Sequence, residues 1–251
     1  MMSAVMSRDE FAQKLRSTLE ERRTLDHPIF RELFTEGQNW PLLRMITIEG
    51  YQITRYFIEY IANLYFYCPL PQYKRRLLIN LFEEETGRIS RTKNHVSLME
   101  DFIRAQGISD PERDAHVPSE STRELIDYRL RAVKTHGMYH IGAAAVMIGS
   151  EGQSLETSEG EPRHALLGRI YGLSEEATRF FAVHQREDVG HVSEGISLVA
   201  DLCTTPQMQE EALEAVSHTC ELFRGMYESV ASQYWSSKKT GSTQERLSPC
   251  S

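Results

Sequence analysis

The sequence predicts an all-helical protein, with a single domain of about seven or eight helices around a common core. Long apolar segments begin and end at residues typical of helix termini, and no segment alternates apolar with polar residues as a half-buried strand would. No internal repeat is visible. The chain has 251 residues, 40% of them hydrophobic and 25% charged, which suffices for one domain with a substantial core.

The first half of the chain contains two long segments with helical character. Before these two segments, Ser7 and Glu10 form a capping box that opens a helix. A very apolar segment covers residues 40–67 and ends at Pro69, because proline cannot continue a helix. A second long segment covers about residues 72–105. We therefore expect two long helices here.

The second half continues the helical pattern. Ser121 and Glu124 form another capping box, opening a helix that extends to about Glu151 or beyond, with Gly137 as a position where it could kink. Two further helices are predicted over about residues 174–203 and 206–235.

Residues 1–235 are expected to form the domain. The polar tail, residues 236–251, is expected to be disordered because it has too little apolar surface to bury.

Charge, cysteines and hydropathy exclude several classes of protein. A net charge of −8 disfavours nucleic-acid binding, which requires basic surfaces. Four widely spaced cysteines without a C-x-x-C pair argue against a disulfide framework or a zinc–thiolate site. The sequence contains neither a membrane-spanning apolar run nor a secretory signal. We therefore expect a cytoplasmic protein.

The most informative local pattern is His184, Asp188 and His191. These residues stand at i, i+4 and i+7, so on a helix they share one face. The surrounding sequence is apolar, and burying two imidazoles and a carboxylate without partners is costly. The pattern favours a metal site, the alternative being a solvated face that is rich in histidine.

Candidate partners for a metal lie in three other segments. Glu84 and His95 are eleven residues apart, three turns of a regular helix, while Glu85 is one position round. Glu59 and Glu151 are isolated acids in or beside apolar stretches, where a carboxylate is paired or ligated. For each of these two acids taken alone, a salt bridge with a neighbouring arginine is the alternative. Carboxylates and imidazoles together suit iron or manganese.

The order Glu, Glu-Glu-x-Gly, Asn-His, Glu, His-x3-Asp-x2-His over residues 59–191 resembles the haem-oxygenase-like di-iron oxidases and oxygenases. The resemblance implies a haem-oxygenase-like bundle that binds two Fe(II) ions, with no catalytic residues beyond the metal ligands. It assigns one iron to Glu59, His95 and His191. It assigns the other to Glu85, Glu151, His184 and Asp188. Helix geometry favours Glu84 over Glu85, and a break in the helix would reconcile the two.

The resemblance also implies an activity. We expect an O2-dependent oxidase or oxygenase that acts on a small amino acid or its derivative, by N-oxygenation or oxidative C–C cleavage including decarboxylation, in a specialised biosynthetic pathway. The small-molecule substrate, an external electron donor and a homodimer are the expected partners, with no nucleic acid or membrane. A non-catalytic binding protein on the same scaffold, or a metal-free enzyme of the fold, is the alternative.

One segment is a poor helix former. Gly87 costs about 1 kcal/mol relative to alanine in a helix interior, and the residues after it add weaker penalties. We hypothesise that residues 86–94 become ordered only when iron binds, which hydrogen exchange with and without Fe(II) would test.

Overall fold

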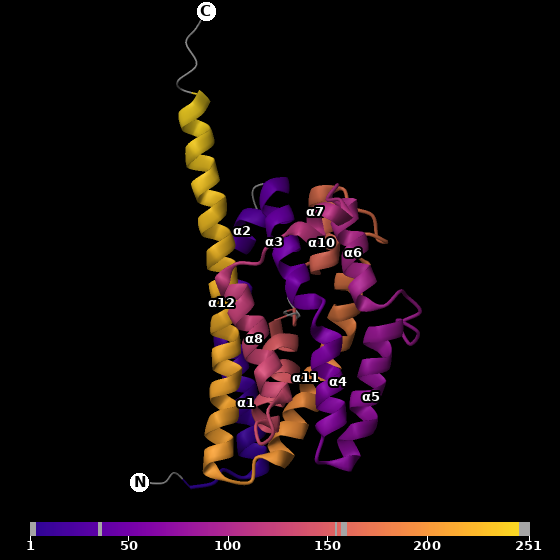
Figure 1. Cartoon of the computed structure of the whole chain (residues 1–251), viewed down its shortest axis with the longest axis vertical. Helices are drawn as coiled ribbons and strands as arrows, with labels where there is room; N and C mark the ends of the chain where they lie inside the picture. The colour runs from indigo at the N-terminus through magenta and orange to yellow at the C-terminus, as the bar shows by residue number, and fades with distance from the viewer. Residues whose placement is uncertain (1–3, 35–36, 154, 157–159, 246–251) are drawn as a thin grey trace, which may run out of the picture.

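The computed structural model describes residues 4–34, 37–153, 155–156 and 160–245, and within them every regular element is helical (Figure 1). The prediction of an all-helical fold is confirmed. The helices are α1 (Arg8–Arg22), α2 (Pro28–Phe34), α3 (Trp40–Thr54), α4 (Phe57–Tyr67), α5 (Pro71–Thr86), α6 (His95–Ala105), α7 (Asp110–Ala115), α8 (Glu120–Lys134), α9 (Tyr139–Ala143), α10 (Arg163–Tyr171), α11 (Arg179–Leu202) and α12 (Pro206–Glu245).

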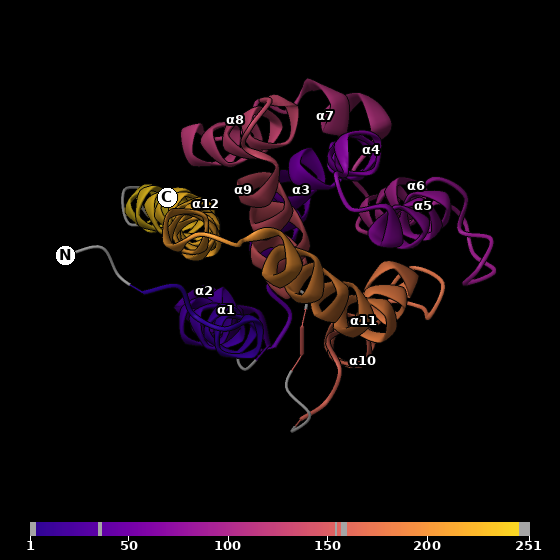
Figure 2. The same cartoon turned by 90° about the horizontal axis from the view of Figure 1, so that it is seen from below.

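The middle of the bundle is formed by α9 and the π-helical turns that follow it. The π segment, Ala144–Ser150, is buried throughout and leads into a 3-10 turn at Glu151–Gln153. Helices α8, α11 and α12 pack around this centre, as the view along the bundle shows (Figure 2). Because the π segment carries small and aliphatic residues only, it can be enclosed on all sides without burying an unpaired side-chain charge.

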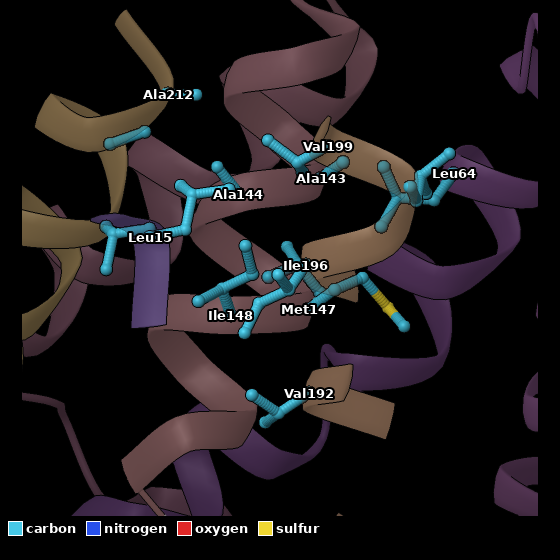
Figure 3. Packing of buried hydrophobic residues seen from close by; sticks show 14 of the residues in the cluster. Leu15, Leu64, Ala143, Ala144, Met147, Ile148, Val192, Ile196, Val199 and Ala212 are labelled. Atoms are coloured by element: carbon cyan, nitrogen blue, oxygen red, sulfur yellow. The ribbon is translucent and has the colours of Figure 1, made fainter. Parts of the chain in front are cut away.

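The core around the π segment is aliphatic. Val192 and Ile196 of α11 pack beside Met147 and Ile148, and Leu15 of α1 lies on the opposite side (Figure 3). Burying each such side chain contributes roughly 1.5–3 kcal/mol. Gly195 permits the close approach of α11, since a Cβ there would lie 2.5 Å from Met147 Cβ. The register of α11 against the π segment is thereby set.

The two long helices predicted in the first half are each interrupted. The segment over residues 40–67 divides into α3 and α4 at Arg55 and Tyr56. The segment over residues 72–105 divides into α5 and α6, because Gly87 adopts a left-handed conformation with φ of 62°. A Cβ at Gly87 would lie 2.1 Å from the carbonyl oxygen of Lys93, so only glycine fits this turn.

Helix boundaries in the second half differ from the prediction in several places. The helix predicted to extend to about Glu151 is divided into α8 and α9 at residues 135–138, where Gly137 has a φ of 89°, and α11 begins at Arg179 rather than near residue 174. The capping residue of α8 is Ser119, whose side chain accepts a hydrogen bond from the amide of Thr122, rather than Ser121. At the other end, α12 continues past the predicted end near Trp235 to Glu245. The segment predicted as a polar tail, residues 236–251, thus begins within α12, and residues 246–251 lie outside the described part. Within the described chain no helix has the length and apolar character needed to cross a membrane.

Candidate metal centre

Helix α11 presents four potential ligands on one face. His184, Glu187, Asp188 and His191 stand at i, i+3, i+4 and i+7, so their side chains point in the same direction. The ring nitrogen Nδ1 of His184 lies 2.8 Å from the carbonyl oxygen of Phe180. Donation from Nδ1 to that oxygen leaves Nε2 as the nitrogen that can bind a metal.

The facing side of the centre comes from α5 and α6. Glu84 is in the last turns of α5, and His95 is the first residue of α6, where Asn94 caps the helix. His95 Nδ1 lies 2.9 Å from Glu84 Oε2 without the alignment of a hydrogen bond. This nitrogen and this oxygen are close without forming a hydrogen bond, which is the arrangement expected of two ligands of one metal ion.

Glu83, next to Glu84, binds the loop that joins α5 to α6. Its carboxylate accepts hydrogen bonds from the amides of Ile89 (2.6 Å) and Ser90 (3.1 Å), which holds the loop between α5 and α6. Although burial raises the pKa of Glu83, its hydrogen bonds with Ser90 and Ile89 lower it overall. The loop in turn sets the position of His95.

Glu151 reaches the centre from the end of the π segment. Its side chain is buried, and Oε1 lies 3.5 Å from His191 Nδ1. Asp188 Oδ1 lies 3.8 Å from the same nitrogen. A π turn places successive side chains at a different angle from an α turn, and such turns are frequent at functional sites. The local irregularity thus turns a carboxylate toward α11.

The side chains form three groups with metal-ligand composition, and the ligand atoms within each group lie within 4.8 Å of one another. The first group contains Glu84, His95 and His184, and the neighbouring second group contains Glu151, Asp188 and His191. The third set, Glu83, His95 and Glu187, shares His95 with the first group, and its Glu83 already accepts the amide hydrogen bonds of Ile89 and Ser90. The rings of His95 and His184 are 4.7 Å apart between centroids. Glu187 Oε2 lies 3.8 Å from His95 Nε2, next to the first group.

In the two groups, burial and neighbouring charges act on the pKa values of the histidines. Burial, followed by the charge of His95, lowers the pKa of His184 to about 3, so this imidazole is in the neutral form that binds metals. For His191 burial acts downward, but Glu151 outweighs it and raises the pKa to about 9. His95 behaves likewise, since Glu84 and other carboxylates raise its pKa against the effect of burial. Burial raises the pKa of Glu187.

The unsatisfied atoms of the centre fit a metal. Both ring nitrogens of His95, Nδ1 of His191, Oε1 of Glu151 and Oε2 of Glu187 are buried and have no hydrogen-bond partner among the described residues. An unpaired buried polar group costs about 1–3 kcal/mol, and more if charged. Cations bound between the helices would satisfy these atoms together, and the donor set of imidazoles and carboxylates suits iron.

The structure brings together five of the seven predicted ligands: His95, Glu151, His184, Asp188 and His191. Their grouping differs from the assignment that the resemblance implied, because His191 lies with Glu151 and Asp188, whereas His95 lies with His184.

Glu59 and Glu85 do not join the centre. Glu59 is half-exposed and forms an ion pair with Lys134, so the alternative of a salt bridge applies to it, with lysine in place of arginine. Glu85 is exposed, and the buried Glu84 occupies the position by His95.

Glu187 was missed by the sequence reasoning. Its i+3 spacing from His184 is a signal that could have found it. Glu84 lies beside His95, as predicted from the spacing of eleven residues, but the two do not share a regular helix, because a turn separates α5 from α6.

A cavity of about 190 Å³ adjoins the metal centre. Glu84, Glu151 and His184 line it, while most of the remaining wall is aromatic or aliphatic. A single water needs only about 10–15 Å³ of such space, so the cavity has room for a small organic molecule.

Sequence comparisons relate the chain to known proteins. A sequence profile described as "Iron-containing redox enzyme" matches residues 45–224. The 4-aminobenzoate synthase of Chlamydia muridarum is 24% identical over 87% of this chain and 89% of its own length. That of Nitrosomonas europaea is 24% identical, over 95% and 99%.

Solved structures resemble the fold. A TenA homolog from Pseudomonas syringae matches with a TM-score of 0.71 at 14% identity, over 92% of this chain and 98% of its own. A Shewanella denitrificans domain of unknown function with a heme oxygenase-like fold matches with a TM-score of 0.68 at 15% identity, over 92% and 95%. At these identities the likeness concerns the fold alone, which is haem-oxygenase-like as predicted.

Proposed function

Because this chain belongs to the iron-containing redox enzyme family and is an oxidoreductase, we propose that it is a non-haem di-iron enzyme that uses O2 to oxidise a small amino acid or amino-acid derivative. The observation that carries the proposal is the pair of adjacent ligand groups, which both draw residues from one face of α11. A single ion would leave one group of buried carboxylate and imidazole atoms unsatisfied.

Each group would hold one iron. Glu84, His95 and His184 fit the first ion, and Glu151, Asp188 and His191 fit the second, with Glu187 beside the first group. The bound ferrous ions would supply electrons for the reduction of O2. Complete reduction of O2 to two waters takes four electrons, so a substrate that gives up two requires an external donor for the other two.

The chain's own contribution is the enclosure of the reaction. Phe180 and Phe181 line the cavity beside His184, and Met99 and Phe102 of α6 line it as well. An apolar wall excludes water and strengthens electrostatic interactions at the centre. The names of two relatives, both called 4-aminobenzoate synthase, support a reaction that involves an aromatic or amine-bearing compound.

Anaerobic Fe(II) loading followed by exposure to O2 tests this proposal. We expect about two irons per chain and O2 consumption that accelerates in the presence of the correct amino acid or derivative. The matched control is His191→Ala, which removes a ligand of one ion and should leave about one iron per chain. Absence of iron binding would refute the proposal and favour a metal-free enzyme. Two bound irons without reaction with O2 would favour a binding protein.

A further inference from the structure

Arg129 is a completely buried charge in the cavity beside the metal centre. It belongs to α8, is 0% exposed, and is the largest of the fully buried side chains. Its Nε donates to the carbonyl oxygen of Leu125 (3.0 Å) and its Nη1 donates to Ser150 Oγ (3.1 Å). Its Nη2 has no hydrogen-bond partner within the described residues.

No carboxylate among the described residues neutralises this guanidinium. The rings of Tyr60 (4.7 Å) and Phe223 (5.6 Å) lie against it, and their attraction offsets only part of the cost of burying the charge. Burial lowers the pKa of Arg129, yet an arginine remains protonated in proteins. A buried, charged donor that faces a cavity indicates a ligand with a negative charge.

Arg113 shows what a structural buried arginine of this protein looks like. It is 7% exposed, and its guanidinium lies within 3.3 Å of carboxylate oxygens of Glu100, Asp110 and Asp114. Arg129 is more deeply buried and has none of these partners. The two sites therefore differ in that Arg113 has carboxylates to balance its charge, whereas the site of Arg129 lacks an anion among the described residues.

The cavity connects Arg129 to the metal centre. Arg129 and Ser150 line the same space as Glu151, which follows Ser150 in the chain, and as His184. Most of the other lining residues are apolar, among them Ile53 of α3 and Phe57 of α4. A ligand with one acidic end and an apolar body matches this distribution of charge.

We propose that Arg129 binds the carboxylate of the substrate, and that the substrate is a carboxylic acid with an apolar body of about the size of one ring. This inference rests on the proposed function, because the bound acid is the substrate only if the protein is the proposed oxidase. Arg129 fixes which end of the molecule faces away from the ligand groups, so it is a positioning and specificity-determining residue for oxidation at the other end. An acid is favoured over its uncharged analogue because Nη2 supplies a charge-assisted hydrogen bond.

Binding of benzoate and of uncharged benzamide, measured by calorimetry, tests the assignment. The metal-free chain and the anaerobic Fe(II)-loaded chain are both titrated, since benzoate could otherwise bind through iron alone. We expect benzoate to bind at least tenfold more tightly than benzamide in both forms. In Arg129→Met this preference should fall by about 10- to 100-fold, as expected for the loss of a charged hydrogen bond.

Two further variants make the test decisive. Arg129→Lys retains the charge and should keep part of the preference for benzoate. Arg163 also lines the cavity but lies 3.9 Å from Glu156, so Arg163→Met tests the other positive charge. Benzoate bound equally by Arg129→Met and the unchanged protein would overturn the assignment. So would a preference that Arg163→Met alone removes.

Thermal unfolding separates a binding role from a structural one. Replacing an unpaired buried charge by an apolar side chain of similar length should leave the melting temperature unchanged or higher. A large drop in Arg129→Met would assign Arg129 to architecture and overturn the proposal. Benzoate selectivity without O2 consumption would instead refute the oxidase and leave the carboxylate site intact.

Discussion

Two polar clusters of this protein each pair a buried glutamate with histidine, and they differ in whether their buried atoms have hydrogen-bond partners. At the junction of α3 with α8, the Glu49 carboxylate contacts His116 Nε2 (2.6 Å) and accepts hydrogen bonds from Ser119 N (2.8 Å) and the Thr122 hydroxyl. At the metal centre, buried atoms of His95 and Glu151 have no hydrogen-bond partner in the part of the chain that the structure describes. A cluster that is complete by itself holds helices together, whereas an incomplete one requires a ligand.

The adjacent residues Glu84 and Glu85 give the largest expected contrast. Glu84→Ala should lose about one iron per chain and reduce O2 consumption at least about 100-fold, because a ligand of the first group is removed. Glu85→Ala should keep both, since Glu85 is exposed. Iron stoichiometry by atomic emission and an oxygen electrode measure the effect. Equal losses of iron in the two variants would contradict the assignment of Glu84, and not Glu85, to the metal centre.

Glu49→Gln tests the complete cluster. Burial raises the pKa of Glu49, but hydrogen bonds led by that from His116 lower it from 4.5 to about 2. The depressed pKa corresponds to about 3 kcal/mol of stability above pH 4.5, which is lost as the pH falls toward 2.

In urea denaturation at pH 7 we expect Glu49→Gln to be destabilised by roughly that amount, while it retains its full iron content. The difference between Glu49→Gln and the unchanged protein should shrink as the pH falls from 4.5 to 2. Loss of iron from this variant would mean that the two clusters are not independent.

Glu187→Gln gives a smaller effect at the metal centre. Its carboxylate lies 3.8 Å from His95, beside the first group rather than within it. We expect about tenfold weaker Fe(II) affinity, as for the loss of a group that supports a ligand, measured by competition with a chelator. Glu59→Gln is the matched control and should bind iron normally, because Glu59 pairs with Lys134. Weaker binding in Glu59→Gln would restore Glu59 to the ligand set.

The smallest expected effect is on the loop between α5 and α6. Glu83 accepts amide hydrogen bonds from this loop, and His95 follows it, so Fe(II) bound at His95 should slow amide exchange over residues 86–94 several-fold. Hydrogen exchange with and without Fe(II) measures it, with the amides of α1 as an internal reference. Identical protection in the two states would refute the hypothesis that iron orders this segment.

Sequence alone was sufficient where one helix carries the information. The spacing of His184, Asp188 and His191 predicted a common face, because 3.6 residues per turn place i, i+4 and i+7 together whatever the surroundings. Likewise, Ser7 and Glu10 form the capping box that their spacing predicts.

Only the tertiary structure decided which side chains from different elements meet. Glu84 and Glu85 are equivalent in local sequence, and the left-handed turn at Gly87 together with the packing of α6 determines which of them faces His95. Glu59 is an acid in an apolar stretch, yet the position of α8 gives it Lys134. Arg129 has no sequence signature at all. Its burial, and the absence of a carboxylate partner among the described residues, arise from the arrangement of several helices around one cavity. Periodicity within an element carries no information about that arrangement.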